Sequence, residues 1–119
     1  MIRVPERYQD ILKRSKEYAG LMALSIGKKD FSNLTAMREY ALFMQEHFAH
    51  SVFLIADLPK IHNIMALDCV SWNEAERRAK LAGDDMQRNL DKIVRQIPSV
   101  KVSRWADFQD IWYGHNRQV

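Results

Sequence analysis

The stretch Gly-Leu-Met-Ala-Leu-Ser-Ile at residues 20–26 decides the fold, because it is a short apolar run that opens on a glycine. Apolar residues fill it without strict alternation, which is typical of a parallel strand buried on both faces. A second run of this kind, Ser-Val-Phe-Leu-Ile-Ala, occupies residues 51–56 and is closed by Asp57-Leu58-Pro59. Two buried strands joined by a helix predict a right-handed βαβ unit with parallel strands.

The residues between and after these runs have helical periodicity. Ser32 is the predicted cap of the connecting helix, which places on one face Leu34, Met37, Ala41, Met44 and Phe48. A short helix is predicted over 60–67, and Ser71 caps a long helix that ends near Ile97, before Pro98. The long helix has a narrow apolar face made by Ala75, Ala79, Ala82, Met86, Leu90, Ile93 and Ile97.

The remaining segments predict one more strand and two more helices. Residues 99–104 alternate and predict a third strand nearer an edge, while helices are predicted over 5–18 and 105–113. Three parallel strands with helices between them resemble half of a doubly wound sheet. We therefore predict an α/β fold and expect residues 1–119 to form a single, incomplete domain.

Composition places the chain among ordinary globular proteins. It has 119 residues, of which 47% are hydrophobic and 28% charged, and this excludes a chain that is disordered throughout. The net charge of +3 permits a polyanionic partner without requiring one. The single cysteine, Cys69, is expected to be a small buried apolar group and fits a reducing, cytoplasmic setting. No apolar run reaches the length of a membrane span, and the charged N-terminus lacks a signal-peptide core.

Ser25 is the candidate nucleophile. It ends the first predicted strand, at the edge where open α/β sheets bind ligands, and the following helix would point its N–H groups there. A hydroxyl at this place can attack a carbonyl while helix N–H groups stabilise the oxyanion. No histidine is near it in sequence, and a serine that ends a strand is more often a turn or cap residue. The adjacent loop, Gly27-Lys28-Lys29, matches no phosphate-binding fingerprint and is interpreted as solvated.

Two other patterns are candidate binding sites. His47 and His50 lie three apart, but no third ligand is evident, so no metal site is expected. The face of the long helix opposite its apolar residues carries five cations, a plausible contact for phosphates: Arg77, Lys80, Arg88, Lys92 and Arg95. Asp84 and Asp91 share this face at ion-pair spacing, so a solvated, salt-bridged surface is an equally good interpretation.

Taken together, the segments resemble the N-terminal half of tRNA-dependent cyclodipeptide synthases. In that family a strand ends in apolar-Gly-apolar-Ser and is followed by a loop, Phe-Ser and a helix, and residues 21–32 follow this arrangement with Ala23 at the glycine position. The resemblance continues through residues 52–57, 65–67 and 74–80 and covers roughly residues 18–108.

The resemblance implies a Rossmann-like three-layer αβα fold, akin to the catalytic domain of class I aminoacyl-tRNA synthetases. It implies an aminoacyltransferase without a cofactor, in which a serine accepts the first aminoacyl group from aminoacyl-tRNA. A second aminoacyl-tRNA then yields a dipeptidyl-enzyme, which cyclises and leaves. Ser25 matches that nucleophile, and the basic helix matches the one that contacts tRNA.

The sequence departs from the family at two substrate-binding positions, where Ala23 replaces a glycine and Lys28 replaces an asparagine. The family's proton-handling tyrosine and glutamate would lie beyond Val119. Two hypotheses follow: an enzyme half that carries only the nucleophile, or a non-catalytic short relative that binds tRNA or a protein partner. An unrelated nucleotide-binding module is a third alternative, disfavoured because no phosphate fingerprint is present. In either of the first two cases we expect a homo-oligomer or a partner that supplies the missing C-terminal half.

Overall fold

The computed structural model describes residues 3–27 and 29–108. Its centre is a sheet of three parallel strands in the order β1 (Ala19–Ser25), β2 (His50–Ala56) and β3 (Val100–Arg104). Each strand lies within a residue of its predicted range. The α/β class and the parallel arrangement are therefore confirmed.

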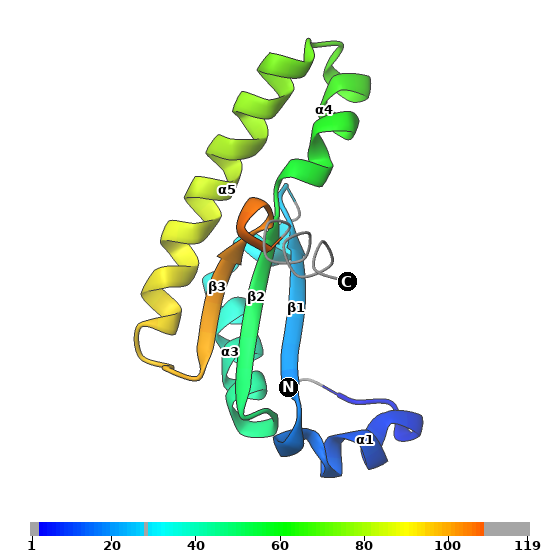
Figure 1. The fold of residues 1–119 in the computed structure, drawn as a ribbon, viewed down its shortest axis with the longest axis vertical. Helices are drawn as coiled ribbons and strands as arrows, with labels where there is room; N and C mark the ends of the chain where they lie inside the picture. Colours follow the sequence, from blue (N-terminus) through cyan, green and yellow to red (C-terminus); the bar gives the residue numbers. More distant parts are fainter. Residues whose placement is uncertain (1–2, 28, 109–119) are drawn as a thin grey trace, which may run out of the picture.

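Helices connect the strands (Figure 1). Between β1 and β2 the chain forms α2 (Lys29–Ser32) and α3 (Leu34–His47). Between β2 and β3 it forms a 3-10 turn, η3 (Leu58–Lys60), then α4 (Ile61–Asp68) and the long α5 (Trp72–Val94). Helices α3 and α5 pack against each other and on the same face of the sheet, while α4 and the first half of α5 extend beyond the carboxyl ends of the strands.

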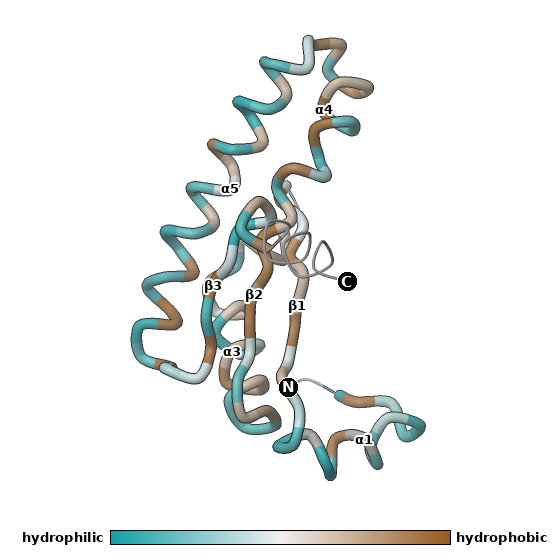
Figure 2. The backbone as a smooth tube through the Cα atoms, viewed as in Figure 1, coloured by the Kyte–Doolittle hydropathy of each residue, from teal (hydrophilic) through white to brown (hydrophobic). Residues whose placement is uncertain are grey.

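The core lies between the sheet and these two helices. Hydrophobic residues concentrate in the strands and alternate with polar ones along α5 (Figure 2). Among the fully buried side chains are Leu24, Phe53, Ile55, Met37, Ala41, Ala75, Ala79, Leu90 and Val100. Burying side chains of this kind contributes about 1.5–3 kcal/mol for each large aliphatic or aromatic residue. The predicted apolar faces of α3 and α5 are thus the faces that pack, although Leu34 is 48% exposed.

The N-terminal segment is not the continuous helix predicted over 5–18. It is divided into η1 (Glu6–Tyr8), α1 (Gln9–Lys13) and η2 (Ser15–Glu17). The segment lies at the amino end of β1 and most of its described side chains are exposed. Short helices gain most of their stability from packing, so a segment without a buried face does not hold one long helix.

The predicted start of α5 is confirmed, whereas its predicted end and the predicted cap of α3 are wrong. Ser71 caps α5 as expected, since its hydroxyl accepts a hydrogen bond from Glu74 N, but α5 ends at Val94 rather than near Ile97. The cap of α3 is Asn33, not Ser32. Of the helix predicted over 105–113, residues 105–108 are helical, and the rest lies outside the described residues.

Cys69 is exposed, so the prediction of a buried apolar group is wrong. It adopts a left-handed conformation with φ of 52° and ends α4. Its position is set by the tight reversal into α5 and not by packing of its side chain.

The prediction that the first strand is buried on both faces is also wrong. In β1, Gly20 and Leu24 face the helices and are buried, whereas Ala19, Leu21 and Ala23 alternate with them and are exposed. Leu21 is 58% exposed, and β1 pairs with β2 alone among the described strands. An apolar run shows that a strand prefers burial, but it does not show that a second layer is present to cover it.

A buried ion pair joins the carboxyl ends of β2 and β3 to α5. Arg104 ends β3, and Asp57 follows β2 with only 2% of its surface exposed. The guanidinium donates from Nε at 3.1 Å and from Nη2 at 2.5 Å to Asp57 Oδ2. From Nη1 it donates to Asp84 Oδ1 at 2.6 Å and Gln87 Oε1 at 3.1 Å, and from Nη2 to Lys80 O at 3.3 Å.

These contacts use all the hydrogen-bonding capacity of the guanidinium. An arginine has five N–H donors, and Arg104 makes five hydrogen bonds. Burial opposes its charge, but the hydrogen bonds with Asp84 and Asp57 outweigh that effect and raise the pKa of Arg104. Asp57 Oδ1 also accepts from Leu58 N at 2.9 Å, which ties the start of the η3–α4 segment to the same pair. Arg104 is therefore a structural clamp with no donor left for a ligand.

Gly83 makes the clamp possible. It lies within α5, and a Cβ there would come 2.5 Å from Arg104 Nη2 and 2.7 Å from Asp57 Oδ2. Glycine inside a helix costs about 1 kcal/mol relative to alanine, so helix propensity alone does not explain it. The missing side chain lets the ion pair approach the helix backbone.

We predict that Gly83→Ala lowers the free energy of unfolding by about 1–3 kcal/mol, because the new methyl group collides with the clamp. In the Asp57→Ala/Arg104→Ala background both colliding groups are gone. There, Gly83→Ala should be neutral or stabilising by up to about 1 kcal/mol through helix propensity. Denaturant unfolding of the four proteins measures this coupling, and an equal cost of Gly83→Ala in both backgrounds would show that the clamp does not require the glycine.

Candidate functional site

Ser25 lies where the sequence predicted, at the carboxyl end of β1. It pairs in register with Ala56, the last residue of β2, which directly precedes Asp57. Its side chain is partly exposed, and by strand alternation it lies on the face that carries Leu21 and Ala23 rather than on the helix-covered face. No base forms a hydrogen bond with its hydroxyl among the described residues. The position suits a nucleophile that an added layer would enclose.

The turn after Ser25 depends on Gly27. Its φ of +83° is in the left-handed region, where a side chain would be strained. Lys28, the other predicted loop residue, lies outside the described residues. The chain then passes through α2 and enters α3 at Leu34, whose N-terminus is at the same edge of the sheet. Asn33 Oδ1 already accepts from Ala36 N at 3.2 Å, so one free N–H of that terminus is occupied.

Two cavities flank this turn. One has a volume of about 260 Å³ and lies between the turn, α2 and α5, lined by Ile26, Gly27, Phe31, Ser32, Ala82, Asp85, Met86 and Asn89. The other has a volume of about 320 Å³ and lies between the turn, α4 and α5. It is lined by Ile26, Gly27, Lys60, Asn63, Ile64, Leu67, Asp68, Arg78 and Ala82. Ser25 lines neither of them, and its neighbours Ile26 and Gly27 line both. The expected cleft is thus beside the serine turn and not over the hydroxyl itself.

Ala23 is two residues before Ser25 on the same face of β1, opposite Leu54. It is exposed, as is Leu21 before it. A glycine at this position in the family would give the same small surface without a methyl group. Ala23 and Ser25 therefore share a surface that the described part of the chain leaves open.

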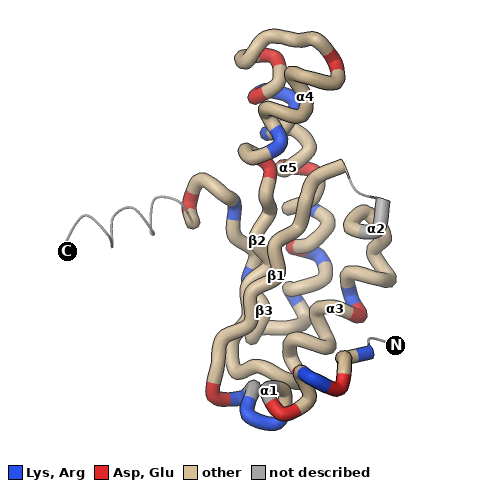
Figure 3. The backbone as a smooth tube through the Cα atoms, turned by 90° about the vertical axis from the view of Figure 1, so that its right-hand side faces the viewer, with Lys and Arg blue, Asp and Glu red and all other residues tan. Residues whose placement is uncertain are grey.

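Most cations of the predicted basic stripe are engaged by acids of α5 itself. Arg77 donates to Glu74, with Nε–Oε2 and Nη2–Oε1 distances of 2.9 and 2.5 Å. Lys80 contacts Glu76 at 3.0 Å, and Arg88 contacts Asp85. Acidic and basic residues are interspersed along this part of the fold (Figure 3). The alternative of a salt-bridged surface is therefore correct for three of the five residues.

The partners differ from those expected. The hydrogen bonds from Arg77 and Arg78 lower the pKa of Glu74 to about 2, so this carboxylate remains charged and paired in any mildly acidic solution. Asp84 turns to Arg104 rather than to Lys80 or Arg88. Within the described residues, Asp91 forms no ion pair, and neither do Lys92 and Arg95 near the end of α5. The unpaired positive charge of the stripe is therefore at its C-terminal end.

The histidines do not form a metal centre in the described part of the chain. His47 is partly buried, with its ring 4.4 Å from that of Phe43, and His50 is exposed at the start of β2. No group of three metal-ligating side chains is found among the residues that the structure describes. Nor do those residues include a helix long and apolar enough to cross a membrane.

Sequence reasoning missed the Asp57–Arg104 clamp. Each residue follows or ends a predicted strand, and carboxyl ends of parallel strands share one edge, so this was the available signal. The contact with Gly83 spans separate elements and has no local pattern. Arg38 of α3 was also not predicted as a site residue, although it lines the same groove as Lys92.

Comparison with known proteins identifies the fold. No protein-family model and no curated protein matches the sequence. Solved structures do match, and one is a cyclodipeptide synthase from Fluoribacter dumoffii with a TM-score of 0.74 and 19% identity. It aligns over 88% of this chain and 46% of its own length.

Two further structures agree. The Mycobacterium tuberculosis protein Rv2275, described as showing that cyclodipeptide synthetases are related to type I tRNA synthetases, has a TM-score of 0.71 and 20% identity over 86% of this chain and 46% of its own. AlbC, a cyclodipeptide synthase from Streptomyces noursei, has a TM-score of 0.64 and 20% identity over 77% and 44%. The chain thus spans about half the length of the structures it matches, and over that half it has the cyclodipeptide synthase fold.

Proposed function

We propose that this chain carries the nucleophile half of a cyclodipeptide synthase-like aminoacyltransferase. The observation that supports this most directly is Ser25 at the carboxyl end of β1, in a fold shared with cyclodipeptide synthases over about half their length. The substrate would be an aminoacyl-tRNA, and no cofactor is required because its ester is already activated. Ala23 and Lys28, which flank Ser25, would contact the aminoacyl group.

The first chemical step is an acyl transfer between two oxygens. Ser25 Oγ attacks the ester carbonyl of the aminoacyl-tRNA, and an ester bond to the serine forms. The bond to the ribose oxygen of the tRNA breaks, and the serine proton leaves with that oxygen as a hydroxyl. Transfer to a second aminoacyl group and cyclisation need groups that hold the amine and move protons, and no such group is identified beside Ser25 among the described residues.

Incubation of the chain with charged tRNA tests this step. Intact-mass measurement should show one added aminoacyl residue on the wild type and none on Ser25→Ala. Ser103→Ala is the matched control, because Ser103 is a partly exposed serine of β3 that lines neither cavity, and its loss should leave acylation intact. No cyclic dipeptide should form from this chain alone, and formation of one would show that the chemistry is complete here.

A non-catalytic relative that binds tRNA or a protein partner is the second candidate. It is favoured by the absence of a base bonded to the Ser25 hydroxyl in the described part of the chain. It is also favoured by Ala23 and Lys28, at which the sequence departs from the family pattern. Binding of tRNA without any acylation of Ser25 would select this candidate over the first.

We also propose that the open face of the sheet is covered in the working protein. The exposed edge of β1 and the exposed Leu21 call for a second layer. This layer is either a second copy of the chain or a partner protein.

Self-association at high concentration is the expected outcome for the isolated chain, measured by light scattering. Leu21→Lys should weaken it, because a charge would enter the covered face. Leu81→Lys makes the same change at a half-exposed position on α5 and should have no effect. A monodisperse monomer at high concentration would contradict the proposal for self-association.

The stripe on α5 is the proposed tRNA contact, through phosphates rather than bases, and comprises Arg77, Lys80, Arg88, Lys92 and Arg95. Its acids reduce the positive field, so affinity should be lower than for a purely basic helix. The double substitution Arg88→Glu/Arg95→Glu should weaken retention of tRNA on a filter at low salt. Unchanged retention would mean that this face is only solvated.

A further inference from the structure

A groove between α3 and α5 combines unpaired cations with amide donors. It has a volume of about 430 Å³, within the usual size range of ligand clefts. Residues of α3, of α5 and of the turn after α5 line it, and its polar side chains include Arg38, Gln45, Asn89, Lys92 and Gln96. Its lining combines aliphatic side chains with two cations and three carboxamides.

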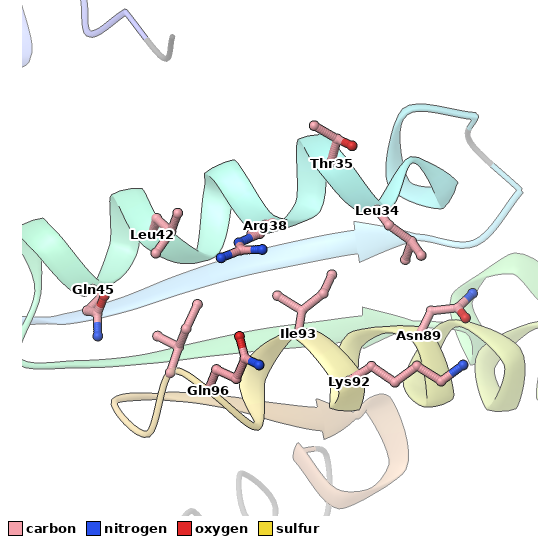
Figure 4. Close-up of a pocket in the computed structure, with 10 residues that line it drawn as sticks. Leu34, Thr35, Arg38, Leu42, Gln45, Asn89, Lys92, Ile93 and Gln96 are labelled. Carbon is pink, nitrogen blue, oxygen red and sulfur yellow. The ribbon is translucent and has the colours of Figure 1, made fainter.

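The charges of the groove are not balanced from within. No acidic side chain is among the lining residues, and neither Arg38 nor Lys92 forms an ion pair within the described part of the chain. Both are exposed. Figure 4 shows the Arg38 guanidinium between α3 and α5 and the Lys92 side chain running along α5 toward Asn89. This differs from Arg77, Lys80 and Arg88, whose charges are met by neighbouring acids.

The groove continues toward the serine turn. Asn89 lines both the groove and the cavity of about 260 Å³ that Gly27 and Phe31 border. A chain-like ligand that reaches the turn after Ser25 can therefore run past Asn89 into the groove. Its charge must be negative to match Arg38 and Lys92.

We propose that this groove is a binding site for the phosphodiester backbone of RNA, with Arg38 and Lys92 as its phosphate-contacting residues. The inference rests on the proposed function, because it takes tRNA as the ligand of this chain. It places the main contact with tRNA at the C-terminal end of α5 rather than along the whole helix, and it adds a contact from α3. The amides of Gln45, Asn89 and Gln96 are positioned as additional donors to phosphate or ribose oxygens.

Uncharged tRNA is the probe, so that binding is measured without acyl transfer. Replacing Arg38 and Lys92 by Gln should lower affinity roughly five- to eightfold for each residue at about 0.1 M salt. The slope of log affinity against log salt concentration should fall by about 0.7–0.9 for each cation lost. Arg38→Lys keeps the charge and should retain the slope. The positions are exposed, so the variants should unfold at the wild-type temperature.

The control variant is Lys13→Gln/Lys101→Gln, which removes the same charge at two exposed positions that do not line the groove. It should leave the slope close to the wild-type value. An equal fall in the control would show that only net charge matters, and wild-type binding by Arg38→Gln/Lys92→Gln would also overturn the groove assignment. In both cases acylation of Ser25 would still stand as evidence for the proposed function.

Two other outcomes separate the proposals. If the wild type binds no tRNA and Ser25 is not acylated, the proposed function and the groove assignment both fail. If polyglutamate binds through Arg38 and Lys92 and tRNA does not, the groove is a docking site for an acidic protein and the inference about RNA is wrong.

Discussion

The buried ion pair between Asp57 and Arg104 is the interaction on which the carboxyl edge of the sheet depends. It links the ends of β2 and β3 to each other and to α5, and it also holds the first turn of the segment leading to α4. A buried pair of this kind is costly to break, because removal of one partner leaves the other charged and desolvated, at about 3–5 kcal/mol. Gly83 in the middle of α5 is explained by this pair, because any side chain there would occupy the space of the Arg104 guanidinium and the Asp57 carboxylate.

The clamp organises two of the three strands and leaves β1 outside it. Ser25 is held in register by β2 but faces a side of the sheet that the described residues do not cover. The Asp57–Arg104 clamp and Ser25 thus lie at the same edge of the sheet, but the clamp joins β2, β3 and α5, whereas Ser25 belongs to β1. This arrangement fits the proposed function, in which one layer of helices fixes the sheet and a second would enclose Ser25. The match to cyclodipeptide synthases over about half their length agrees with it.

Local sequence patterns predict the strands and the packing faces of α3 and α5 correctly, because apolar runs and helical periodicity depend directly on which residues are buried. They failed where the outcome depends on a distant partner. The run in β1 predicts burial on both faces although Leu21 is exposed, and the N-terminal segment, whose described side chains are mostly exposed, is not one helix. At the site, the place of Ser25 followed from strand order. The clamp and the pairing of Asp84 with Arg104 join residues 47 and 20 positions apart, so strand order indicates only that Asp57 and Arg104 share an edge and not that they pair.

The state of the Arg104 guanidinium tests this account most directly, and nuclear magnetic resonance of arginine side-chain N–H groups measures it. The account predicts that near neutral pH Arg104 gives resolved Nη–H signals that exchange slowly with water, since every donor is bonded. In Asp57→Asn those signals should broaden or average as the guanidinium becomes free to rotate. Averaged, rapidly exchanging signals in the wild type, like those of the exposed Arg14, would contradict the claim that the clamp holds this edge.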